Sequence, residues 1–214
     1  MGNLNSPTGA FEKYYRDLQF ERDGLFALVQ QQYHPTEVLY PGCSIHLTPA
    51  FFFPHVVFVD QDPAVSAYFQ NQEAVLELVN RQRRYRRNPY IRFISQDFTK
   101  PLPVPLDEFD LVLGLYTGGV VKACRSYLKI GGMLLTNNHQ GDALEAARDQ
   151  ELALVAAIKL HKGKYRFVDG EPGERLQAEA RGKRTRRYLR RTSRGEEYID
   201  RESYYLFERI RPRG

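Results

Sequence analysis

The chain has 214 residues, of which 42% are hydrophobic, enough for one sizeable folded domain and too few for two ordinary ones. No apolar run approaches the roughly 20 residues of a membrane-spanning helix, and the first residues lack the apolar stretch of a secretory signal. The two cysteines, Cys43 and Cys124, have no spacing typical of a metal or redox site. A cytoplasmic protein without membrane contact is therefore expected.

Basic residues are concentrated in two stretches, although the net charge is only +5. Residues 181–194 hold eight of the 31 basic residues, and residues 81–92 hold six arginines, with no acid in either. Without the first stretch, 23 basic residues face 26 acidic ones, a net charge of −3. Such a concentration indicates either a polyanion-binding segment or a solvated loop. The candidates for phosphate contact in the first stretch are Arg181, Lys183, Arg184, Arg186, Arg187, Arg190, Arg191 and Arg194.

The N-terminal half begins with apolar residues at helical spacing, which predict two helices within a segment of residues 1–36. Asp23-Gly24 separates these helices, and His34-Pro35 ends the second. Short apolar runs then predict buried strands at residues 38–40, 56–59 and 91–94. A short helix is expected after Thr48-Pro49, and a long one runs from Asp62-Pro63 into the arginines of residues 81–92.

The C-terminal half continues the alternation with a strand at 109–113, a helix at about 120–128 and a strand at 133–136. Asp142 and Glu145 resemble a capping box and predict a helix to about Leu160. Strands at 165–168 and 204–210 flank a basic insertion, residues 171–200. This order predicts an α/β domain over residues 37–214, with a doubly wound, mainly parallel, seven-stranded sheet.

The segment from Glu37 to Asp62 carries the clearest sign of a ligand site. The first predicted strand leads into the turn Pro41-Gly42-Cys43-Ser44, and the second ends in Asp60. A glycine turn lets backbone N–H groups approach a ligand, and an acid after the second strand accepts from ribose hydroxyls. Because Asp62 precedes a proline and is the better helix cap, Asp60 is left for the ligand. An adenosine-containing ligand is therefore expected here.

Together with three later segments, this turn and Asp60 resemble the class I S-adenosylmethionine-dependent methyltransferases, from about Glu37 to Ile210. The later segments are Asp97-Phe98, Phe109 to Gly114, and Leu128 to Leu135, where Ile130 replaces the usual proline. The resemblance implies a Rossmann-like methyltransferase fold and S-adenosyl-L-methionine as cofactor. The residues that it assigns to the cofactor are Tyr40, Pro41, Gly42, Cys43, Ser44, Asp60, Gln61, Asp97, Phe98, Gly114 and Tyr116.

The glycine turn departs from the family pattern and leaves the activity open. Gly42 is its only glycine, where the family usually has two or three, and Ser44 replaces the second. The chain is thus either a methyltransferase or a degenerate relative that binds cofactor or nucleic acid without transferring a methyl group. A dinucleotide cofactor is less favoured, because no G-x-G-x-x-G turn is present.

The methyl acceptor is not specified by the sequence, and both a small molecule and RNA remain open. The fourth strand is not followed by the [DN]-P-P-[YF] motif, which disfavours transfer to amino groups of bases or glutamine. Tyr116 and His139 follow the fourth and fifth strands and are candidate catalytic residues. Alternatively, Tyr116 stacks on the cofactor and His139 lies in a polar loop. No two histidines have metal-ligand spacing.

Overall fold

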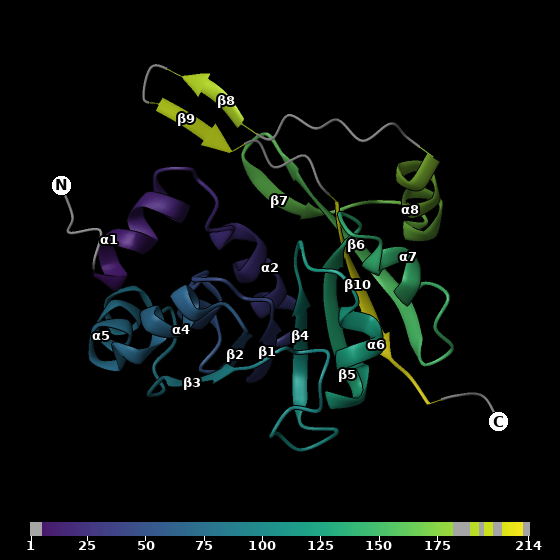
Figure 1. Ribbon diagram of the computed structural model, residues 1–214. Helices are drawn as coiled ribbons and strands as arrows, with labels where there is room; N and C mark the ends of the chain where they lie inside the picture. Colours follow the sequence, from purple (N-terminus) through teal and green to yellow (C-terminus); the bar gives the residue numbers. More distant parts are fainter. Residues whose placement is uncertain (1–5, 182–188, 193–194, 199–202, 212–214) are drawn as a thin grey trace.

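The computed structural model describes residues 6–181, 189–192, 195–198 and 203–211. An eight-stranded sheet forms its centre, and a separate two-stranded hairpin lies beside it (Figure 1). The strands of the main sheet are β1 (Glu37–Pro41), β2 (His55–Asp60), β3 (Tyr90–Ser95), β4 (Phe109–Gly114), β5 (Leu128–Asn137), β6 (Leu152–His161), β7 (Lys164–Phe167) and β10 (Ser203–Arg209). The hairpin consists of β8 (Leu189–Thr192) and β9 (Gly195–Tyr198).

The helices form two layers, one on each face of the sheet (Figure 1). The first layer consists of α1 (Pro7–Phe11), the π-helix η1 (Glu12–Arg16), α2 (Asp23–Tyr33), α3 (Pro49–Phe52), α4 (Pro63–Gln70) and α5 (Gln72–Gln82). The second consists of α6 (Val120–Cys124), the 3-10 helix η2 (Arg125–Tyr127), α7 (Asp142–Ala146) and α8 (Pro172–Arg181).

The strand order is β3-β2-β1-β4-β5-β10-β6-β7. Strands β1 to β5 pair in parallel, whereas β10 lies antiparallel between β5 and β6. The predicted fold class, a mainly parallel Rossmann-like sheet with helices on both faces, is confirmed. The sheet has one strand more than the seven predicted.

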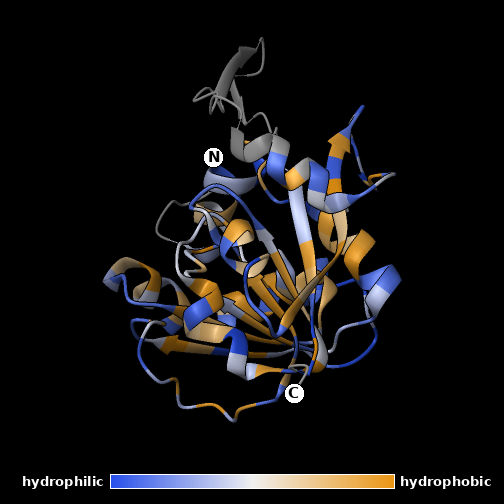
Figure 2. Ribbon diagram, turned by 90° about the vertical axis from the view of Figure 1, so that its right-hand side faces the viewer, coloured by the Kyte–Doolittle hydropathy of each residue, from blue (hydrophilic) through white to orange (hydrophobic). Residues whose placement is uncertain are grey.

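Two hydrophobic cores fill the spaces between the sheet and its helix layers. Successive strand residues alternate between them, as the two-residue period of a strand requires: Leu111 and Leu113 join the first core, and Val112 joins the second. In β10, Tyr204 and Tyr205 divide in the same way. Figure 2 shows the resulting apolar centre, with hydrophilic residues toward the outside.

The predicted helix from Asp142 to Leu160 is wrong beyond its first turns. Helix α7 ends at Ala146, and Leu152–His161 is strand β6, paired with β10 and β7. Its alanines and leucines favour a helix, but pairing on both sides overrides that preference. Ion pairs fix the intervening turn, since Arg125 contacts Asp149 and Glu151.

The long helix predicted from Asp62 is also divided in two. Asp62 caps α4 by accepting from the Ala64 amide at 2.7 Å, as expected. The chain then breaks at Asn71, whose side-chain oxygen accepts from the Ala74 amide at 3.3 Å and caps α5. Asparagine is among the residues most favoured at a helix N-cap, which explains why a new helix, α5, begins after Asn71 although the apolar pattern continues.

Neither a membrane span nor a metal centre is found among these residues. Within the described ranges, no helix combines the length and apolar character needed to cross a bilayer. The same ranges contain no cluster of three or more His, Cys, Asp or Glu residues arranged to hold a metal ion.

Candidate functional site

The turn after β1 binds to the end of β2 through its own backbone. The amides of Gly42 and Cys43 donate to the Val59 carbonyl at 2.8 and 3.3 Å. The Ser44 amide donates to Asp60 Oδ2 at 2.9 Å. The expected presentation of these three amides to a ligand is therefore not what the structure shows, because each already has a protein acceptor.

Gly42 is required where the turn meets the loop after β4. Its φ of +62° favours glycine, and an added Cβ would lie 2.6 Å from Thr117 Oγ1. The single glycine thus permits close contact between the two loops. The neighbouring Cys43 is buried, and burial raises its pKa well above the ordinary value. Cys43 therefore has the environment of a core residue and not of a reactive thiolate.

Asp60 joins two loops at the carboxyl end of β2. Besides the Ser44 bond, its Oδ1 accepts from the Asp62 amide at 3.0 Å. Its carboxylate is half-buried at the edge of the sheet, next to the exposed Gln61. Each carboxylate oxygen can accept a second hydrogen bond, so Asp60 can also bind hydroxyl groups.

Asp97 lies near Asp60, since Ser95 of β3 pairs with Asp60 in the sheet. Its Oδ1 accepts from the Thr99 amide at 2.9 Å and from the Thr99 hydroxyl at 2.8 Å. These bonds hold the pKa of Asp97 below its usual value. Phe98 turns away to pack against the second core. The two acids therefore lie at the carboxyl ends of the neighbouring strands β2 and β3.

Tyr116 follows β4 in a strained backbone conformation, with φ of +60°. Its amide donates to Asn137 Oδ1 at 3.2 Å, and its hydroxyl lies 3.3 Å from the Tyr204 hydroxyl. The ring centroids of Tyr116 and His139 are 5.1 Å apart. The candidate catalytic residues thus lie side by side beyond β4 and β5. Gly114, the last residue of β4, is buried.

Arg22, Phe20 and Tyr204 complete this end of the site and were not identified from the sequence. Arg22 is only 4% exposed, and its guanidinium lies 3.5 Å from the Phe20 ring centroid and 4.6 Å from that of Tyr116. Its Nε donates to the Tyr204 hydroxyl at 2.7 Å. A buried cation is thus held by aromatic rings, the Tyr204 hydroxyl and the Phe20 carbonyl beside the candidate catalytic residues.

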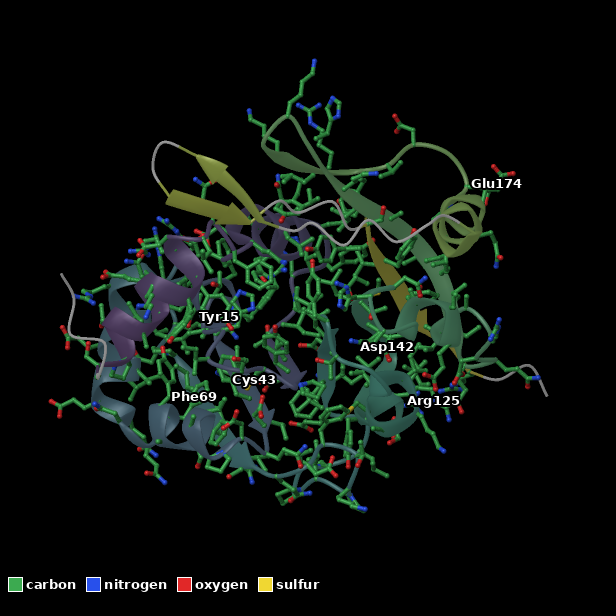
Figure 3. The ribbon with its side chains drawn as sticks, turned by 45° about the horizontal axis from the view of Figure 1, so that its top comes forward. Tyr15, Cys43, Phe69, Arg125, Asp142 and Glu174 are labelled. Carbon is green, nitrogen blue, oxygen red and sulfur yellow. The ribbon has the colours of Figure 1, made fainter. Side chains whose placement is uncertain are left out.

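His46 attaches the N-terminal segment to the turn after β1. Its Nδ1 lies 3.0 Å from the Tyr40 hydroxyl, and its Nε2 lies 3.0 Å from the Glu21 carbonyl. The Tyr15 ring stacks on the imidazole at 4.6 Å, and Figure 3 shows Tyr15 above Cys43. Burial lowers the pKa of His46 to about 3, so the imidazole is neutral.

Backbone strain is concentrated around this site. Of the seven non-glycine residues with positive φ in the described ranges, four lie here: Gln19, Arg22, Ser44 and Tyr116. Such conformations cost about 1–3 kcal/mol each, and they persist where the surrounding structure enforces them, often at functional sites.

Asp142 has a different role from the predicted capping box. It begins α7, whose N-cap is Gly141, and its Oδ1 accepts from the Val120 amide of α6 at 3.0 Å. Burial raises the pKa of Asp142 to about 6. The carboxylate therefore joins the loops after β4 and β5 instead of capping its own helix.

The basic stretch of residues 181–194 is only partly described. Arg181 ends α8, and Arg190 and Arg191 belong to β8. The predicted phosphate contacts Lys183, Arg184, Arg186, Arg187 and Arg194 lie outside the described residues. The role assigned to this stretch stays a prediction.

Comparison with known proteins supports the fold. No protein-family model matches the sequence, and a search of curated proteins gives no match. A protein from Klebsiella pneumoniae that is proposed to be an O-methyltransferase has a TM-score of 0.51 and 10% identity, over 99% of this chain and 92% of that one. An rRNA methylase from Streptococcus thermophilus has a TM-score of 0.50 and 9% identity, over 91% and 97%. The chain therefore has the Rossmann-like fold found in methyltransferases.

Proposed function

We propose that this protein is an S-adenosylmethionine-dependent methyltransferase whose acceptor is a small molecule or RNA. The observation that carries the proposal is the pair Asp60 and Asp97 at the carboxyl ends of β2 and β3, in a sheet with β10 inserted between β5 and β6. In open α/β sheets, ligands bind at the carboxyl ends of the strands.

The acidic edge of the site suits the nucleoside half of this cofactor. Asp60 would accept from the ribose hydroxyls and Asp97 from an adenine amino group, because both carboxylates retain acceptor capacity. When bound, the cofactor supplies a sulfonium methyl group that is already activated for transfer. The protein then has mainly to align the acceptor and exclude water. Tyr116 and His139 are the residues proposed to face that acceptor.

The alternative is a protein of this fold that binds the cofactor or nucleic acid without transferring a methyl group. It is favoured by one observation, the engagement of all three turn amides with Val59 and Asp60. Incubation with methyl-labelled cofactor and either total RNA or a small-molecule extract separates the two. Methyl transfer is supported if the label enters the RNA or the small-molecule fraction with the wild-type protein and enters neither with Asp60→Ala.

Titration with S-adenosylmethionine and its demethylated product tests the proposal most directly. Calorimetry is expected to show one saturable site per chain for which both compounds compete. The absence of saturation below about 1 mM, where binding is worth only about 4 kcal/mol, would remove the cofactor from the proposal.

Asp97→Ala is expected to weaken cofactor affinity about tenfold, because one charged hydrogen-bond acceptor is lost. Thr99→Ala is the matched control, since it removes a side-chain donor to Asp97 and leaves the carboxylate in place. Equal weakening in both variants, measured by the same calorimetry, would assign the effect to loop structure and not to ligand contact.

A further inference from the structure

A second concentration of positive charge lies in the loop that joins α5 to β3 (Figure 1). This loop leads into the amino end of β3, whereas Asp60 and Asp97 lie at the carboxyl ends of β2 and β3. Its residues are Arg83, Arg84, Arg86 and Arg87, here named the arginine loop. The last three are exposed, and Arg83 is half-buried. Within the described part of the chain, none of the four forms an ion pair with an acid, although Arg84 acts on Asp23 at longer range. The loop thus presents concentrated positive charge.

The arginine loop is fixed to the body of the protein by its backbone and by a tyrosine. The Arg84 amide donates to the Phe51 carbonyl at 2.7 Å, and the Tyr85 hydroxyl donates to the Ala50 carbonyl at 2.8 Å. The guanidinium of Arg83 donates to the Arg87 carbonyl and closes the loop. Because the backbone is already ordered, little entropy is lost when the loop binds a partner.

The chemistry of this surface fits phosphodiesters better than carboxylates. All its cations are arginines, whose planar guanidinium matches phosphate oxygens and stacks on flat rings. Tyr90 begins the edge strand β3 directly after the loop and is 54% exposed. An exposed aromatic ring beside a row of arginines is the arrangement that binds single-stranded nucleic acid, through phosphate contacts and base stacking.

We propose that Arg84, Arg86, Arg87 and Tyr90 form a binding surface for single-stranded nucleic acid, with Arg83 holding the loop in shape. The inference deepens the proposed function, on which it rests for its link to methyl transfer, by favouring a nucleic-acid acceptor over a small molecule. Its test measures binding without the cofactor. Failure of that test therefore leaves the cofactor titration unaffected.

The experiment measures retention of a labelled oligouridine and of the matching oligodeoxyuridine over a range of salt concentrations, with polyglutamate as competitor. Each neutralised phosphate on a single strand adds about −0.7 to the log–log salt slope, so the triple variant R84Q/R86Q/R87Q should make the slope shallower by about 2. Tyr90→Leu should weaken oligonucleotide binding at least about fivefold, since the stacked base is lost. Polyglutamate should compete poorly.

The matched control is K162Q/K164Q/R166Q, which removes the same charge from exposed residues around the turn between β6 and β7. It should leave the slope unchanged, and thermal unfolding should show that both triple variants are folded. Equal retention of the two oligonucleotides supports phosphate and base contacts, whereas preference for oligouridine supports an additional contact to the 2′-hydroxyl.

Three results would overturn the inference. The first is a triple variant that binds like its control. The second is full competition by polyglutamate together with normal binding by Tyr90→Leu, which would indicate an acidic protein partner. The third is loss of binding only when the eight basic residues of 181–194 are changed to glutamine, which would place the contact in that stretch.

Discussion

Lowering the pH from 7 to 4.5 should reduce the free energy of unfolding by roughly 2.5 kcal/mol through His46 alone. Its pKa falls from 6.5 to about 3 on folding because burial disfavours the charged imidazole. The unfolded chain therefore binds the proton more readily. The contribution of His46 is fully present above pH 6.5 and is lost as the pH falls from 6.5 toward 3. Urea unfolding at a series of pH values measures this loss.

His46→Gln should reduce that pH dependence, since an amide does not titrate in this range and can still donate to the Glu21 carbonyl. His161→Gln is the control, because His161 is exposed. Asp142 acts in the opposite direction: its raised pKa means that its contribution is lost as the pH rises through about 6. The difference between wild type and His46→Gln isolates the histidine, and an unchanged pH slope in that variant would contradict the assignment.

Asp60→Ala should weaken the binding of S-adenosylmethionine at least about a hundredfold, because hydrogen bonds to a charged group contribute about 1.5–3 kcal/mol each and two ribose hydroxyls would lose their acceptor. The fold should survive, since the amide donors that are released belong to the exposed Ser44 and Asp62 and can bond to water. Calorimetry gives the affinity, and circular dichroism checks the fold.

Asp62→Ala is the matched control for that experiment. It removes a carboxylate two residues away whose bond is to the Ala64 amide in the cap of α4. Loss of the cap should cost about 1 kcal/mol of stability and leave cofactor affinity unchanged. Wild-type affinity in Asp60→Ala, or equal weakening in both variants, would show that Asp60 does not bind the ribose.

The sequence predicts the elements whose signals are local. The strands ending at Asp60 and Gly114 are short apolar runs, and Asp62-Pro63 is a helix start that needs no distant partner. Strand β6 could not be predicted in this way. Its residues favour a helix, and pairing on both sides makes it a strand. One partner, Ser203–Arg209, is distant in the chain, and the other, Lys164–Phe167, follows it after a two-residue turn.

The candidate site divides along the same line. Asp60 and Asp97 could be placed because Asp60 ends β2 and Asp97 lies two residues after the end of β3, and parallel strands bring their carboxyl ends together. Arg22 and Tyr204 could not, since they are 182 positions apart in the chain and meet only through tertiary packing. Likewise, the sequence predicts a turn at Gly42, but it does not predict that the amides of this turn donate to Val59 and Asp60.

The insertion of β10 between β5 and β6 has a consequence for biosynthesis. Until Ser203–Arg209 leaves the ribosome, β5 and β6 each keep one row of backbone hydrogen-bonding groups without a neighbour. Both strands are synthesised before that segment. Until it emerges, the sheet is therefore in two parts, and each part exposes one unpaired strand edge. The chain is therefore most prone to aggregate while the basic stretch is being translated. Repulsion between the basic stretches of neighbouring nascent chains would oppose that aggregation.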